Sequence, residues 1–116
     1  MPFITNKMLC DFFINGKPRV PKIKNIHSKV YEAAKRPRAL KMDDFHTCET
    51  THCRAGWVVH LAGEAGYALE EIFDTEIAAI LIYKVSGYEI DAIKFFDSKK
   101  EALADMKQLA EQEGKS

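Results

Sequence analysis

The sequence predicts a mainly α-helical fold, a compact bundle of four to five helices preceded by an N-terminal hairpin or extended arm. Three observations support this prediction. Apolar residues recur at helical spacing in several segments, most of these segments are bounded by capping or helix-stopping residues, and the composition is 47% hydrophobic and 29% charged, as in ordinary globular domains. With 116 residues the chain has the size of a single domain. We expect residues 1–24 to form the arm and residues 25–116 the helical domain, within one folding unit.

The arm contains several turn signals. Asn15 and Gly16 occupy the position of a hairpin turn. Pro18 and Pro21 cannot donate a backbone hydrogen bond, so any strand here is very short or lies at a sheet edge.

A first helix is expected to follow the arm. Asn25 is a competent N-cap, and Pro37 ends the helix because it disfavours helical backbone at the preceding residue. Residues 37–50 show no sustained periodicity and are expected to form a loop.

The next segment predicts a longer helix over residues 52–65. Thr50 or Thr51 would cap it, and Gly66 would stop it. A short helix is then expected over residues 67–73.

Two more helices complete the expected bundle. Asp74 or Thr75 can cap a helix whose residues 77–83 are apolar all round, so it would be central in the core, although a buried strand fits the same run. Ser98 and Glu101 form a capping box before the clearest amphipathic pattern of the chain. The predicted core combines these helices and comprises Val58, Leu61, Ile77, Ile80, Leu81, Leu103 and Met106.

The net charge is zero but unevenly distributed. Residues 1–41 carry ten Lys and Arg against two acidic residues, whereas residues 42–116 carry seven against fifteen. This asymmetry predicts either contacts between the two parts or separate partners, and it leaves nucleic-acid binding through residues 17–41 possible. No segment is long and apolar enough for a membrane span, and no secretory signal is recognisable, so we expect a cytoplasmic protein with no membrane partner.

The most specific feature is the segment from His46 to His60, rich in histidine and cysteine. A zinc site would use His46, Cys48 and Cys53, because zinc prefers imidazole and thiolate ligands. The histidine and cysteine at positions 52 and 53 would point in different directions on a helix, and no second ligand pair follows. We therefore expect no cofactor, with zinc as the alternative.

Cys53 is also a candidate nucleophile. A helix N-terminus and Arg54 would favour its thiolate, and His46 or His52 could act as the base. The competing interpretation, which we favour, is structural: a small buried residue at the start of a helix.

Four residues of the predicted second helix are candidates for partner binding. Gly56 and Gly63 lie two turns apart, which would open a groove along one face for a neighbouring backbone or a ligand. Trp57 and Arg54 are of the types enriched at protein interfaces.

These segments resemble a family of small phage and prophage proteins without an assigned activity. The resemblance rests on Asn25 to Val30, on Asp44 to Glu64 with its His-Thr-Cys-Glu-Thr-Thr-His-Cys-Arg-Ala-Gly-Trp run, on Phe95 to Ser98, and on Glu101 to Met106. It covers about residues 25 to 110. Family members often carry this module behind pentapeptide repeats, which this chain lacks. The resemblance implies a phage or mobile-element origin and supplies no catalytic residues.

The sequence therefore favours a non-enzymatic interaction module, an accessory protein that binds a host protein, such as an inhibitor of a defence system. The alternative is a thiol-dependent enzyme or zinc-binding domain built on Cys48, Cys53 and the nearby histidines.

Overall fold

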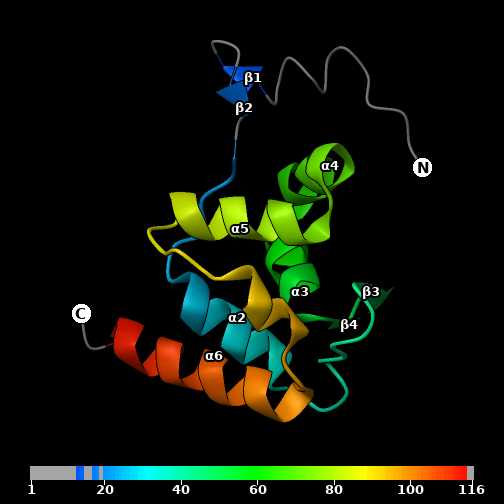
Figure 1. Ribbon diagram of the computed structural model, residues 1–116, viewed down its shortest axis with the longest axis vertical. Coiled ribbons are helices and arrows are strands. Elements are labelled where there is room, and N and C mark those ends of the chain that lie inside the picture. Colours follow the sequence, from blue (N-terminus) through cyan, green and yellow to red (C-terminus); the bar gives the residue numbers. More distant parts are fainter. Residues whose placement is uncertain (1–12, 15–16, 19, 115–116) are drawn as a thin grey trace.

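The computed structural model describes residues 13–14, 17–18 and 20–114 (Figure 1). Five α-helices carry the fold of this part of the chain, and the short 3₁₀ helix η1 (Ala92–Phe96) precedes the last of them. The α-helices are α2 (Ile26–Ala34), α3 (Arg54–Leu61), α4 (Gly63–Phe73), α5 (Thr75–Val85) and α6 (Lys99–Gly114). The predicted mainly helical class is confirmed.

The arm contains a short hairpin. Strands β1 (Phe13–Ile14) and β2 (Lys17–Pro18) pair antiparallel, and their two-residue length agrees with the limits set by proline. The expected turn residues Asn15 and Gly16 lie outside the described residues.

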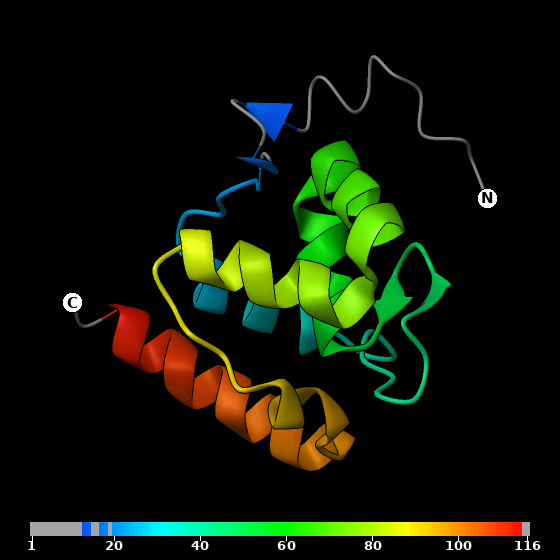
Figure 2. The same ribbon diagram turned by 45° about the horizontal axis from the view of Figure 1, so that its top comes forward.

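The helices form two groups joined by α3. Helix α2 packs along α6, while α3 contacts α2 on one side and α4 and α5 on the other (Figure 2). The predicted core is right only in part. Val58 and Met106 are buried, but Leu61, the last residue of α3, is 37% exposed. Ile77 is 44% exposed, because α5 turns its Ala78, Ala79, Ile82 and Tyr83 side inward and is not buried all round. Ile80, Leu81 and Leu103 pack against the core as partly buried residues.

Two of the predicted helix caps are present. The Asp74 carboxylate accepts the Ile77 N–H at 2.8 Å at the start of α5. Before α6, the Ser98 hydroxyl oxygen accepts the Glu101 N–H at 3.3 Å, and the hydroxyl donates to the Glu101 carboxylate at 2.9 Å.

Asn25 holds the predicted N-cap position directly before α2, but it does not cap the helix with its side chain. The Asn25 backbone is left-handed, with φ 57°. The carboxylate of Glu113, at the far end of α6, accepts the amides of His27 and Ser28 at 3.2 and 2.9 Å instead. A side chain from another helix therefore caps α2.

The predicted helix over residues 52–65 is two helices. It ends at Leu61, because Gly63 has φ 71° and provides the left-handed residue that commonly follows a helix end. Gly66, predicted to be the stop, lies inside α4, where an added Cβ would overlap the Val59 carbonyl oxygen. Its absence of a side chain lets α4 approach α3 closely.

The predicted loop over residues 37–50 contains a strand. Strand β3 (His46–Cys48) pairs antiparallel with β4 (Thr51–His52), and Leu40 forms a parallel bridge with His52 on the other side. This β3–β4 hairpin leads directly into α3.

Candidate functional site

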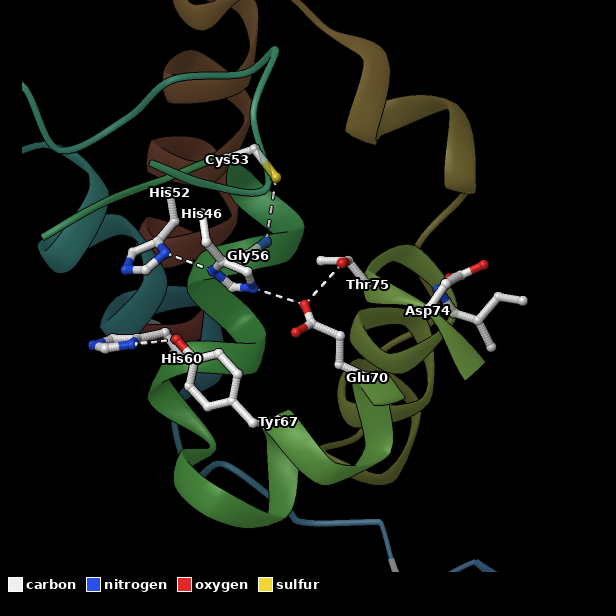
Figure 3. Close-up of polar contacts among 10 residues, drawn as sticks. His46, His52, Cys53, Gly56, His60, Tyr67, Glu70, Asp74 and Thr75 are labelled. Atoms are coloured by element: carbon white, nitrogen blue, oxygen red, sulfur yellow. Dashed lines mark hydrogen bonds and ion pairs between the residues drawn. The ribbon is translucent and has the colours of Figure 1, made fainter. Parts of the chain in front are cut away.

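The β3–β4 hairpin is tied to helices α4 and α5 by a partly buried chain of hydrogen bonds (Figure 3). His46 Nδ1 lies 2.7 Å from His52 Nδ1, and His46 Nε2 lies 2.7 Å from Glu70 Oε2. The same Glu70 oxygen accepts the Thr75 hydroxyl at 2.8 Å. At the other end of the chain of bonds, His52 Nε2 lies 2.9 Å from the Glu49 carbonyl oxygen.

The partners fix where the protons lie in this network. A carbonyl oxygen only accepts, so His52 Nε2 carries a hydrogen. Burial lowers the pKa of His52 and keeps it neutral, which leaves its Nδ1 as an acceptor for the Nδ1–H of His46. The other ring nitrogen of His46, Nε2, contacts the Glu70 carboxylate at 2.7 Å. Every nitrogen of His46 is therefore engaged.

An aromatic layer packs against the same histidines. The His52 ring stacks on His60 with centroids 4.5 Å apart and meets Trp57 edge-on at 4.6 Å. His60 Nδ1 lies 2.8 Å from the Tyr67 hydroxyl, which comes from α4. These contacts hold the hairpin against both α3 and α4, so its position is rigidly determined.

The two described cysteines have opposite environments. Cys53 is 3% exposed and caps α3, with its Sγ accepting the Gly56 N–H at 3.3 Å, and burial raises the pKa of its thiol. The expected burial at the helix start is confirmed, although Cys53 and not Thr50 or Thr51 is the cap. Cys48 is exposed, and hydrogen bonds with Thr50 and Thr51 lower its pKa to about 7.

The residues of the zinc alternative are not brought together. Cys48 faces solvent, Cys53 faces the core, and His46 bonds His52 and Glu70. Within residues 20–114, no three His, Cys, Asp or Glu side chains are arranged to hold a metal ion. The thiol alternative lacks its base as well, because the ring nitrogens of both candidate bases have other partners: His46 contacts His52 and Glu70, and His52 contacts the Glu49 carbonyl.

Three of the four predicted binding residues lie in the interior. Arg54 is fully buried and pairs with Asp105 at 2.7 Å, and the Trp57 indole donates to the Ala39 carbonyl at 2.7 Å. Gly56 packs on the backbone of the loop before the hairpin, where an added Cβ would overlap the Phe45 carbonyl oxygen. The expected groove between Gly56 and Gly63 is wrong, because the backbone of Phe45 fills the space over the first and the second begins another helix.

A cavity of about 320 Å³ opens beside the hairpin. It lies between the loop before β3, the start of α5 and the 3₁₀ helix η1, and we call it the η1 cavity. Its lining contains three phenylalanines and three carboxylates, together with Met42 and Cys53: Phe45, Phe95, Phe96, Asp43, Asp44 and Glu76. No lysine or arginine of the described chain lines it.

Of the residues that line the η1 cavity, the sequence singled out only Cys53. The available signal was the adjacent pair Phe95-Phe96 in a stretch without helical or strand periodicity. In a 3₁₀ helix, residues three apart share a face, so Ile93 and Phe96 project together, and they are 68% and 71% exposed. Phe45, which also lines the cavity, is 46% exposed.

No protein-family model, curated protein or solved structure matches this chain. None of the helices in the described ranges has the length and apolar character to cross a membrane.

Proposed function

We propose that this chain is a phage or mobile-element accessory protein that acts in the host cytoplasm by binding a host protein, with an inhibitor of a defence system as the expected type. The observation that carries the binding role is the η1 cavity with the exposed Phe45 and Phe96 on its rim. Large apolar side chains grouped at a concave surface are characteristic of interaction sites. The resemblance to phage proteins supplies the biological context.

The surroundings of the cavity favour binding over catalysis. The loop that supplies one wall leads directly into the β3–β4 hairpin, and that hairpin is fixed through His46 and Glu70, so little ordering is needed when a partner docks. The histidines that could act as bases have structural partners, and Cys53, which lines the cavity, is a buried thiol that caps a helix.

The thiol alternative now depends on Cys48. Its exposed thiol with a pKa of about 7 would be partly ionised at neutral pH and could react with a modifying reagent or a partner cysteine. No histidine of the described residues bonds it, so this alternative is limited to thiol modification or exchange.

Nucleic-acid binding through residues 17–41 remains a competing proposal. The Lys and Arg side chains of residues 20–41 are exposed, and in this range Lys35 pairs only with Glu32 of its own helix. Helix α2 packs along α6, whose three lysines nearly balance its four acidic residues, so this contact does not provide the acidic surface that the charge asymmetry predicted. Binding to nucleic acid would be strongly weakened by salt, whereas docking at an apolar rim would not.

The test compares variants of two exposed apolar positions. Immobilised wild-type protein, Phe96→Ser and the control Val85→Ser would be exposed to host lysate, since Val85 is 41% exposed on α5 and does not line the cavity. We expect a discrete host protein to be retained by the wild type and by Val85→Ser, and to be lost with Phe96→Ser. Its affinity would then be measured with both purified proteins. Equal retention by Phe96→Ser, or retention of nucleic acid alone, would contradict the proposal.

A further inference from the structure

Resting on the proposed function, we infer that the η1 cavity receives a cationic side chain of the partner, specifically an arginine. The chemistry of the lining selects this occupant. Phe45, Phe95 and Phe96 offer aromatic surface, while Asp43, Asp44 and Glu76 supply negative charge around the same space.

The carboxylates are available for a partner to differing degrees. Asp44 already accepts the Thr47 hydroxyl at 3.1 Å, so it is partly used within the loop. The side chains of Asp43 and Glu76 make no hydrogen bond or ion pair with any residue in the ranges that the structure describes. Two carboxylates at one cavity without an internal cation leave a local excess of negative charge, which a cation from outside would neutralise.

The aromatic residues favour arginine over other cations. A guanidinium group is planar, stacks on phenyl rings and can bind a carboxylate through two parallel hydrogen bonds, whereas the ammonium group of lysine is compact and strongly hydrated. The cavity of about 320 Å³ lies at the small end of ligand sites, a size that suits one inserted side chain and excludes a folded element. The exposed Phe96 and Phe45 would then cover the aliphatic part of that side chain.

The direct test is a titration with small probes, followed by ¹H–¹⁵N NMR of the full chain. The probes are Nα-acetyl-arginine amide, its neutral near-isostere Nα-acetyl-citrulline amide, and Nα-acetyl-lysine amide. We expect saturable shifts at residues 42–45, 76 and 95–96 with the arginine probe, with a dissociation constant on the order of millimolar. Citrulline should bind at least about fivefold more weakly, because it lacks the charge, and lysine should bind more weakly than arginine.

Matched variants separate charge from fold. Asp43→Asn combined with Glu76→Gln should weaken binding of the arginine probe by about fivefold or more. Glu111→Gln removes one acidic charge near the end of α6 and should change the affinity by less than about twofold. Phe96→Leu keeps an apolar side chain but removes the ring, and it should weaken binding of the arginine probe more than binding of the citrulline probe. The NMR spectrum of each variant reports directly whether it is folded.

Three results would overturn the inference: equal binding of arginine and citrulline, tighter binding of lysine than of arginine, or shifts centred away from the cavity. These outcomes are distinguishable from failure of the proposed function. In one outcome, Phe96→Ser loses host-protein retention while the Asp43→Asn and Glu76→Gln pair changes neither retention nor probe binding. That result would support docking at this face and reject the insertion of a partner arginine. Arginine binding at the cavity without any retained host protein would support the cation site and reject the proposed function.

Discussion

The buried charge of Arg54 allows a quantitative test of how the two helix groups are held together. Its guanidinium is fully buried, with Nη1 2.7 Å from Asp105 Oδ2 and Nε 3.4 Å from the Tyr83 hydroxyl, while Nη2 has no hydrogen-bond partner in the described chain. Asp105 also receives Lys94 at 2.8 Å on its other oxygen. Asp105 is therefore the only carboxylate bonded to this buried cation in the described ranges.

We expect Asp105→Asn to lower the free energy of unfolding by about 2–4 kcal/mol at pH 7. Removing one partner of a fully buried pair costs about 3–5 kcal/mol, and the 23% exposure of the Asp105 side chain lets water compensate part of that loss. Lys94→Met is the matched control, since Lys94 is 33% exposed and its pair with Asp105 should contribute less than about 1 kcal/mol. Arg54→Met combined with Asp105→Leu should be much less destabilising than Asp105→Asn alone, because no buried charge remains.

The Arg54–Asp105 pair also predicts how the stability of the protein changes with pH. Burial raises the pKa of Asp105, but the hydrogen bonds from Lys94 and Arg54 outweigh it, and the net pKa lies below the ordinary 3.8. A depressed carboxyl pKa contributes stability that is complete above the unfolded pKa and is lost as the pH falls through the folded one. The advantage of the wild type over Asp105→Asn should therefore be constant near neutral pH and shrink below about pH 4. Urea unfolding followed by circular dichroism at several pH values measures this, and an Asp105→Asn effect as small as that of Lys94→Met would refute the reasoning.

Three further predictions concern the core, the thiols and the hairpin. Ile82→Ala should lower the free energy of unfolding by about 2–5 kcal/mol, because Ile82 is fully buried. Leu81→Ala should lower it clearly less, because Leu81 is only partly buried. Equal losses in urea unfolding would contradict the burial pattern. At pH 7.5 iodoacetamide should label Cys48, with its pKa of about 7, well before the buried Cys53, as read by peptide mass spectrometry; preferential labelling of Cys53 would reverse the assignment. Glu70→Gln should accelerate amide hydrogen exchange in the β3–β4 hairpin, since the carboxylate ties that hairpin to α4, and unchanged protection would show that the other contacts suffice.

The features that sequence predicted correctly are those specified locally. Asp74 and Ser98 cap the helices that follow them through residues three positions away, and such signals can be read in a short window. The end of α3 was missed because both Gly63 and Gly66 are plausible stops. Only the left-handed backbone of Gly63 decides between them.

The site was predicted only in part, because its decisive contacts are distant in sequence. The segment rich in histidine and cysteine was recognised, and the buried structural position of Cys53 is confirmed. No spacing rule connects His46 to Glu70, which is 24 positions away, so the hairpin was expected to be a loop. The η1 cavity combines residues from the loop, α5 and η1, and each of them looks ordinary in its own segment.

The capping of α2 by Glu113 has a consequence for how the chain is made. The two amides that donate to this carboxylate belong to residues 86 and 85 positions earlier in the sequence. Until the final turn of α6 has left the ribosome, α2 lacks this cap and the helix against which it packs. During synthesis α2 therefore gains its cap and its packing partner only once α6 has emerged, which makes the folding of α2 depend on α6.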